Sequence, residues 1–199
     1  MKRLLHTGCG KKSIVDTTPG FNTGEWEEVR LDIDPDVNPD IVASITDMSA
    51  VQTGSMDGVF SSHTIEHLHP YEVETAMAEF NRVLKPDGFL VVTTPDLESA
   101  CRAVLEGGPL KVVYTTDIGP MTPLDIIYGY RPSTEHFPGM IHKCGFTPQL
   151  LAKCLYASGF KGVLGRSRPN VCDVWMMAFK DATLQSHFQE ISGQHIPSE

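Results

Sequence analysis

The sequence has 199 residues, 41% of them hydrophobic and 21% charged, and this size suits one globular domain with a buried core. Its formal net charge of −9 would repel a phosphate backbone, and no run of Lys or Arg offers a basic stripe, so nucleic acid is not an expected partner. No stretch approaches the roughly 20 apolar residues of a membrane span, and no signal-peptide core follows Met1, so we expect a cytoplasmic protein without a membrane partner.

Short apolar runs alternate with helical patterns along the chain, and this order predicts an α/β fold. Buried parallel strands are expected at 3–7, 28–32, 41–45, 58–61 and 89–94. A closing pair of strands is expected at 162–168 and 171–179.

Two helices are predicted between these strands. Apolar residues recur at helical spacing over 73–84, and the turn-forming residues at 86–88 end that helix. A second helix is expected to begin after Thr147 as N-cap and to stop at Gly159. Its buried face is predicted to hold Leu150, Leu151, Cys154 and Leu155.

Three segments depart from the alternation. Residues 11–24 carry no helical stripe and are expected to form mostly loop. Residues 96–146 contain five prolines, and so long a segment between core elements is typical of a lid or substrate-binding insertion. We therefore expect a single domain over 1–180, with 96–146 as the insertion and 181–199 as a polar C-terminal tail.

Two glycines and an acidic residue form the first candidate site. Gly8 and Gly10 follow the first strand, where backbone without side chains can approach a ligand closely. Asp32 stands roughly 20 positions beyond them, at the end of the second strand, where a carboxylate can accept hydrogen bonds from both hydroxyls of a ribose. Asp34 better suits a solvated turn.

Three further motifs follow in order. Asp47 and Met48 end the third strand, a pairing able to read an adenine amino group and to cover its ring. The fourth strand runs into the sequence Ser-Ser-His-Thr-Ile-Glu-His-Leu at 61–68, and Arg-Val-Leu-Lys-Pro-Asp-Gly follows the first helix at 82–88.

Taken together, residues 4–97 resemble the class I S-adenosylmethionine-dependent methyltransferases with GCG, EHL and RVLKPGG motifs. The resemblance implies a Rossmann-like, doubly wound and mostly parallel seven-stranded sheet with a lid-like insertion after the fifth strand. It also implies S-adenosyl-L-methionine as cofactor. His6 departs from the family, which usually has an acidic residue there. The implied cofactor contacts are Gly8, Cys9 and Gly10 at the methionine end, Asp32 and Ile33 at the ribose, Asp47 and Met48 at the adenine, and Ser61, Ser62 and His63 beneath the sulfonium.

The resemblance further implies methyl transfer to the oxygen or nitrogen of a small-molecule acceptor. His63 is the first candidate for general base, because an imidazole titrates near neutral pH, although it can equally cap Glu66 or pack against the cofactor. His142 is the second catalytic candidate. Substrate-binding candidates lie in the insertion, where one of the two tyrosines is expected to serve packing; they are Asp125, Tyr128, Tyr130, Arg131 and His136.

Two alternatives stay open. Residues 63–67 also spell HxxEH, a zinc-hydrolase pattern in which His63 and His67 bind the metal and Glu66 acts as base, provided that one helix runs through all five residues. The other alternative is a non-catalytic protein that binds S-adenosylmethionine or its demethylated product. Methyl transfer needs no metal, and the five cysteines lack CxxC pairing, so no metal ligands are predicted.

Overall fold

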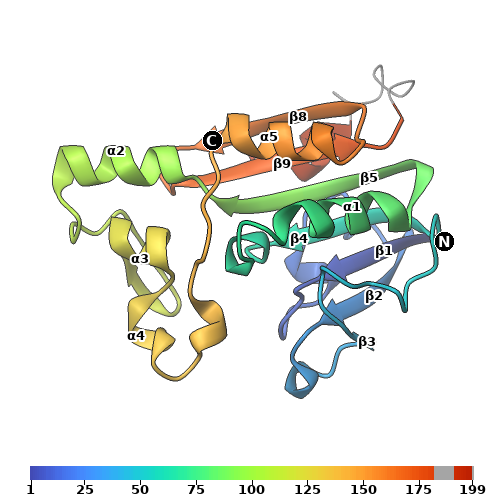
Figure 1. The fold of residues 1–199 in the computed structure, drawn as a ribbon, viewed down its shortest axis with the longest axis horizontal. Helices are drawn as coiled ribbons and strands as arrows, with labels where there is room; N and C mark the ends of the chain where they lie inside the picture. Colours follow the sequence, from blue (N-terminus) through green and yellow to red (C-terminus); the bar gives the residue numbers. More distant parts are fainter. Residues whose placement is uncertain (182–190, 199) are drawn as a thin grey trace.

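The computed structural model describes residues 1–181 and 191–198, and a seven-stranded sheet forms its centre (Figure 1). The strand order is β3-β2-β1-β4-β5-β9-β8, with the first five parallel and β9 antiparallel to both of its neighbours. The strands are β1 Lys2–Thr7, β2 Trp26–Asp32, β3 Ile41–Val42, β4 Met56–Ser62, β5 Leu84–Pro95, β8 Gly162–Arg168 and β9 Asp173–Phe179. The predicted Rossmann-like fold is confirmed.

The central strands are apolar on both faces, as parallel strands covered on both sides require. Successive residues of β1 point to opposite faces: Leu5 joins one buried cluster with Val59 and Leu90, and Leu4 joins another with Phe60. The continuous apolar runs that predicted these strands therefore reflect two cores, one on each side of the sheet.

Two helices cover the first core. These are α1, Val73–Val83, and α5, Pro148–Ala157, whose N-cap hydroxyl on Thr147 accepts a hydrogen bond from the Leu150 amide at 3.2 Å. Leu151 and Leu155 are fully buried, four residues apart on one helix face. Leu150 was expected in the core, but its side chain is 44% exposed. It directly precedes Leu151 in the helix, and adjacent helix positions point in different directions, so Leu150 points away from the buried face.

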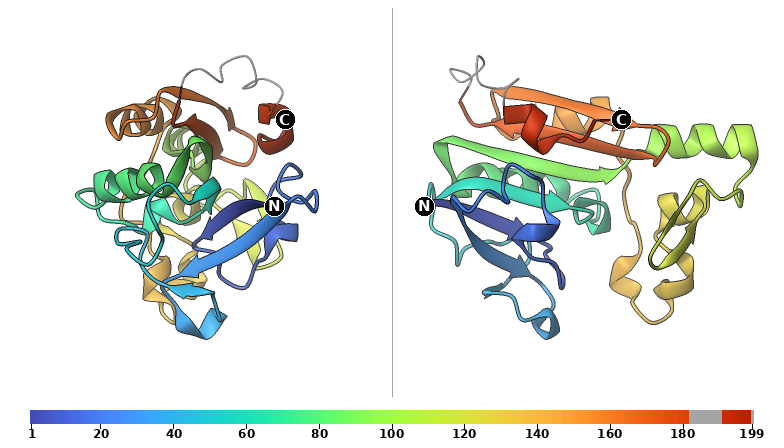
Figure 2. Two further views of the ribbon diagram at one scale, coloured as in Figure 1. Left: turned by 90° about the vertical axis from the view of Figure 1, so that its right-hand side faces the viewer. Right: turned by 180° about the vertical axis from the view of Figure 1, so that it is seen from behind.

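The second core is covered by irregular chain (Figure 2). Residues 11–24 form the predicted loop, with only the short η1, Ile14–Asp16, and they bring Phe21 onto the sheet. Residues 191–195 are helical and place His195 against Phe21, with ring centroids 4.3 Å apart. Part of the predicted polar tail thus completes this core; residues 182–190 and 199 lie outside the described chain.

Two strand ends differ from prediction. β3 stops at Val42 because the chain turns, with the Asp47 amide donating to the Ser44 carbonyl at 3.0 Å. β5 begins at Leu84, directly after α1, and its pairing with β4 shifts register before Phe89. The predicted turn at 86–88 is therefore an irregularity at the start of a strand.

The insertion stands beyond the carboxyl ends of the parallel strands (Figures 1 and 2). It leaves and rejoins the core where Asp96 forms a bridge with Phe146. Its elements are α2 Leu97–Gly107, the hairpin of β6 Tyr114–Thr116 and β7 Gly119–Met121, α3 Pro123–Tyr128, α4 Arg131–Thr134 and η4 Pro138–Met140. No helix among the described residues has the length and apolar character to cross a membrane.

Candidate functional site

The glycine loop and Asp32 meet at one edge of the sheet. β1 and β2 are parallel neighbours, so their carboxyl ends lie side by side. The Gly10 amide donates to Oδ2 of Asp32 at 2.7 Å, and the Asp34 amide donates to Oδ1 at 2.9 Å. The Asp32 carboxylate, 9% exposed, therefore holds the loops after both strands.

Arg30 also joins these loops, and it was not among the predicted site residues. Its guanidinium donates to the carbonyl oxygens of Gly10 at 2.6 Å and Lys12 at 3.1 Å on one side, and of Asn38 at 2.9 Å on the other. Because its partners are backbone carbonyls, no residue motif marks the interaction.

His6, which replaces the family's usual acidic residue, is buried beside a carboxylate from the next strand. Its Nδ1 lies 2.7 Å from Oε1 of Glu28. Burial lowers the pKa of His6, and the hydrogen bond to Glu28 opposes this only in part. An acidic side chain therefore lies beside this position, on β2 instead of β1.

The two predicted adenine-side residues differ in burial. Asp47 is exposed, as is Ile33 beside the predicted ribose site, and the pKa of Asp47 is lowered by hydrogen bonds from Ser49. Met48 is fully buried in the first core, and its amide donates to Glu79 at 2.7 Å. Its side chain therefore packs inside the protein, where it does not cover a surface-bound ring.

The end of β4 carries the next group of predicted residues. Ser61 is fully buried, and its hydroxyl has no hydrogen-bond partner in the described chain. His63 follows in a left-handed conformation with φ +50°, and its amide donates to the Thr93 carbonyl at 2.9 Å. Its side chain is 48% exposed, so its ring is open to a ligand.

Glu66 lies at the centre of three histidines. Its side chain comes from η3, Ile65–His67, is buried, and accepts a hydrogen bond from Thr94 at 3.0 Å. Its other oxygen lies 3.3 Å from Nδ1 of His63. Partial desolvation lowers the pKa of His63, but the hydrogen bond and charge of Glu66 outweigh it, and the net shift is upward. Burial raises the pKa of Glu66, and His63, with weaker help from His67 and His142, reverses it to a net decrease.

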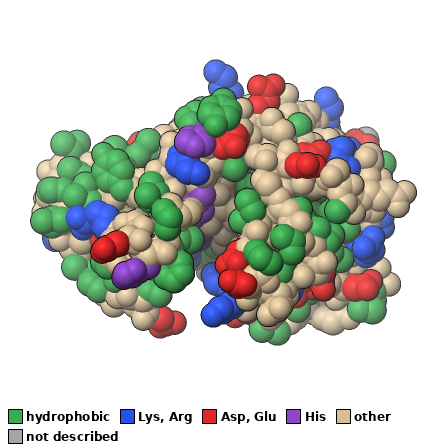
Figure 3. Space-filling view, turned by 60° about the horizontal axis from the view of Figure 1, so that its bottom comes forward, with side chains coloured by type: hydrophobic (Ala, Val, Ile, Leu, Met, Phe, Trp, Pro, Cys, Tyr) green, Lys and Arg blue, Asp and Glu red, His purple; other side chains and the backbone are tan. Residues whose placement is uncertain are grey.

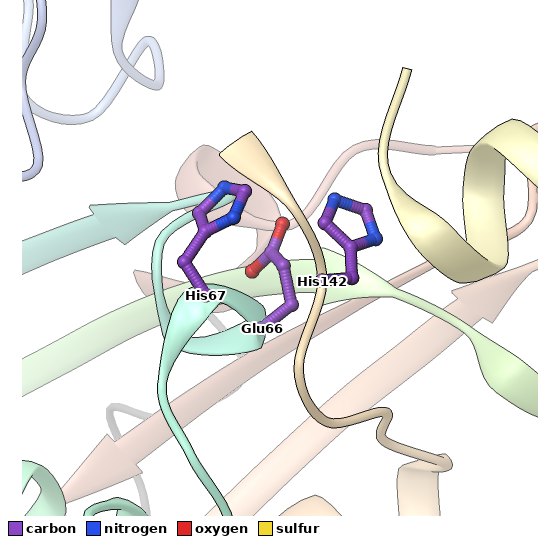
Figure 4. A group of neighbouring side chains, drawn as sticks. All are labelled: Glu66, His67 and His142. Carbon is purple, nitrogen blue, oxygen red and sulfur yellow. The ribbon is translucent and has the colours of Figure 1, made fainter. Parts of the chain in front are cut away.

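His67 and His142 lie on either side of the Glu66 carboxylate (Figure 4). Their ring centroids are 5.0 Å apart. His142 was predicted as catalytic, and the structure brings it from the end of the insertion to the HxxEH segment. That segment, however, forms a short 3₁₀ turn preceded by the left-handed His63. The single helix that the zinc-hydrolase alternative needs is absent from 63–67.

The residues predicted to bind substrate differ from one another in burial and in their contacts within the insertion. Asp125 is buried, caps α3 together with Thr122, and pairs with Arg131 at 2.8 Å. The Tyr130 hydroxyl donates to the Ile118 carbonyl at 2.7 Å, within the insertion. Tyr128 and His136 are exposed.

A hollow separates the insertion from the body of the protein on the face shown in Figure 3. Histidine side chains lie in its depth, and hydrophobic side chains gather on the insertion beside it. The arrangement provides a concave surface at the carboxyl ends of the strands, which is where α/β proteins of this kind bind their ligands.

Comparisons with known proteins agree with this geometry. Residues 5–92 match the family described as "Methyltransferase domain", whereas no protein with curated annotation matches the sequence. A protein of Pyrococcus horikoshii is similar in structure, with a TM-score of 0.62 and 16% identity over 90% of this chain and 82% of its own.

Two further solved structures are similar. A SAM-dependent methyltransferase of Archaeoglobus fulgidus has a TM-score of 0.54 and 17% identity over 89% of this chain and 85% of its own. The 1,6-didemethyltoxoflavin-N1-methyltransferase of Burkholderia thailandensis, solved with 1,6-didemethyltoxoflavin and S-adenosylhomocysteine, has a TM-score of 0.53 and 16% identity over 88% and 69%. Some matched structures are much longer, and this chain spans 46% of one of them. At these identities the likeness shows a shared fold.

Proposed function

We propose that this chain, whose residues 5–92 match the methyltransferase-domain family, is an S-adenosylmethionine-dependent methyltransferase that methylates the oxygen or nitrogen of a small molecule. The observation that supports the proposal is the 2.7 Å hydrogen bond from the Gly10 amide to Asp32, because it joins the two loops proposed to hold the nucleoside. The hollow next to this site suits a small acceptor, and the Burkholderia enzyme of the same fold was solved with one.

The residues at the sheet edge fit the cofactor. Each Asp32 oxygen accepts one amide hydrogen and keeps a lone pair for a ribose hydroxyl. No atom lies within 4 Å of the place where a Cβ on Gly10 would stand, so the backbone there is open. The buried Ser61 hydroxyl, which has no partner among the described residues, is a further polar group at the end of β4.

Residues of the chain itself align the cofactor and the acceptor. S-adenosylmethionine supplies a methyl group activated by a sulfonium, and transfer is an in-line displacement that depends on orientation. In this proposal the glycine loop and Asp32 fix the nucleoside, the hollow receives the acceptor, and His63 hydrogen-bonds the attacking oxygen or nitrogen. His63 suits this role because its ring is half-exposed at the end of β4.

A matched pair of glycine variants tests the loop. A Cβ on Gly8 would lie 2.3 Å from the Thr64 hydroxyl, whereas a Cβ on Gly10 meets only open space. Both glycines have positive φ, +58° and +53°, so each alanine carries a similar backbone strain of about 1–2 kcal/mol.

We expect Gly10→Ala to keep most of its thermal stability and to lose cofactor affinity about tenfold or more, because its methyl group enters the ligand's space. Gly8→Ala should show the larger drop in melting temperature, because its methyl group clashes within the fold. Differential scanning fluorimetry and calorimetry with S-adenosylhomocysteine measure the two effects. Unchanged affinity in a folded Gly10→Ala protein would place the cofactor elsewhere.

Replacing His63 by alanine is expected to lower turnover about 100-fold with less than a threefold change in cofactor affinity. His142→Ala is likewise expected to lower turnover about 100-fold with less than a threefold change in cofactor affinity. Turnover is read as S-adenosylhomocysteine released in the presence of an acceptor found by screening hydroxyl- and amine-bearing metabolites. His69→Ala is the control, because His69 is exposed outside the site. Wild-type turnover in both variants would remove these histidines from the reaction.

Calorimetry on the purified chain tests the function itself. We expect binding of S-adenosylmethionine and of S-adenosylhomocysteine, followed by product release with at least one metabolite. Tight cofactor binding with no product from any acceptor would favour the non-catalytic alternative. Failure to bind either nucleoside would contradict both.

A further inference from the structure

Glu66, His67 and His142 form a set of potential metal ligands that no single sequence motif contains. One donor atom from each residue lies within 4.8 Å of the donor atoms of the other two. Figure 4 shows the two imidazole rings on either side of the carboxylate. Glu66 and His67 come from η3, whereas His142 comes from the segment that leads out of the insertion.

Both imidazoles lie within hydrogen-bond distance of a backbone carbonyl, as metal-binding histidines usually do. Nδ1 of His67 lies 3.2 Å from the Ile141 carbonyl oxygen, and Nδ1 of His142 lies 2.9 Å from that of Ile126. A carbonyl oxygen only accepts, so each Nδ1 carries the hydrogen. Each neutral ring therefore keeps a free lone pair on Nε2. Such a hydrogen bond from the other ring nitrogen is the usual outer support of a metal ligand.

The buried Glu66 carboxylate lacks a full set of hydrogen-bond and ion-pair partners among the described residues, and a bound cation would supply one. Glu66 is 1% exposed, and only one of its oxygens accepts a well-formed hydrogen bond in the described chain, from Thr94. Among the described residues no Lys or Arg pairs with it, and its one ion-pair partner is His63 at 3.3 Å. A buried carboxylate without full compensation is costly, so a bound cation would stabilise it strongly.

We propose that Glu66, His67 and His142 bind one divalent transition-metal ion of the Zn²⁺ type. Two imidazoles and one carboxylate form a known catalytic zinc donor set, which leaves a fourth position open to water or another ligand. Ligand distances of about 2.0–2.2 Å require donor atoms no more than about 4 Å apart, so the set closes by side-chain movements of about 1 Å. His67 and His142 are half-buried and accessible to an entering ion.

This donor set differs from the HxxEH reading of the sequence. His63 is not one of the ligands, and His142 replaces it from 75 residues beyond His67 in the chain. The ion would therefore join the insertion to the end of β4. The inference does not depend on methyl transfer, because metal binding and cofactor binding are measured separately.

Zinc binding to the full chain tests the proposal. The protein is freed of metal with a chelator and titrated with Zn²⁺ by calorimetry, and bound zinc is counted by mass spectrometry after dialysis. We expect one zinc per chain. Loss of an outer-shell partner alone weakens metal sites about 10- to 100-fold, so His67→Ala and His142→Ala should each weaken binding at least about 100-fold.

Two nearby residues give matched controls. His69→Ala removes an exposed histidine outside the set, and Cys144→Ser changes a thiol whose hydrogen points to the Ile65 carbonyl oxygen at 3.4 Å. Both variants should bind zinc as the wild type does. Binding of S-adenosylhomocysteine and metal-free melting temperature report whether each variant is folded. Absence of stoichiometric zinc in the wild type, or wild-type zinc affinity in a folded His67→Ala or His142→Ala protein, would overturn the proposal.

Discussion

An Asp32→Ala variant is expected to bind S-adenosylmethionine about 100-fold more weakly than the wild-type chain, a loss of about 3 kcal/mol. The carboxylate accepts hydrogen bonds from the amides of Gly10 and Asp34 at 2.7 and 2.9 Å. Each amide left without its acceptor costs about 1–3 kcal/mol, partly recovered from water, and the ribose loses its acceptor as well. The variant therefore loses both the hydrogen bonds that hold the two loops and the proposed contact with the ribose.

Calorimetry with S-adenosylhomocysteine checks this result, and two companion variants sharpen it. Asp32→Asn keeps one acceptor oxygen and should fall between the wild type and the alanine variant. Asp36→Ala changes an exposed acid four residues along and should bind normally. Equal affinity of Asp32→Ala and Asp36→Ala would show that the nucleoside does not use this sheet edge.

Acid is expected to destabilise the protein by about 3 kcal/mol through His195 alone as the pH falls from about 7 to about 4. Burial lowers the pKa of His195 from 6.5 to about 4. Its ring packs on Phe21 and Phe89, and its Nδ1 lies 2.6 Å from the Thr18 hydroxyl. The folded state therefore holds the neutral ring.

The direction follows from the two protonation states. Below pH 6.5 the unfolded chain binds a proton at His195 that the folded chain does not bind until about pH 4. The contribution of His195 is thus complete above pH 6.5 and is lost as the pH falls towards 4. Urea unfolding at several pH values measures it as the difference between the wild type and His195→Gln, which keeps a polar group but does not titrate. Parallel pH profiles for the two proteins would contradict the assignment.

Local sequence patterns predicted the elements whose side chains are buried. β1 and β4 lie where apolar runs placed them, β2 and β8 lie within two residues of their predicted ranges, and both predicted helices are present. The insertion was not divided into elements, although the apolar residues of α2 recur at helical spacing at 97, 100, 101, 104 and 105. Only Ser99 and Ala100 of this helix are buried, and Leu105 is 87% exposed, so the spacing does not mark a buried face. Capping by Asp96 and packing against α3 define it instead.

Some residues of the candidate site could likewise be predicted from the sequence, and others could not. Gly8, Gly10 and Asp32 could be predicted because the ends of adjacent parallel strands must meet. Arg30 could not, because its partners are backbone carbonyls from two loops. The neighbourhood of Glu66 depends on the path by which the insertion returns to the core. Only the folded chain brings His142 there, so sequence spacing contains no trace of it.

The place of β9 in the sheet has a consequence for how the protein is made. Residues 173–179 are translated after every other strand of this sheet, yet they pair with β5 on one side and β8 on the other. Until these residues leave the ribosome, β5 has an unpaired strand edge and β8 has no partner strand in the sheet. Completion of the sheet therefore depends on a segment that is translated late, and before then the unpaired strands expose the growing polypeptide to self-association.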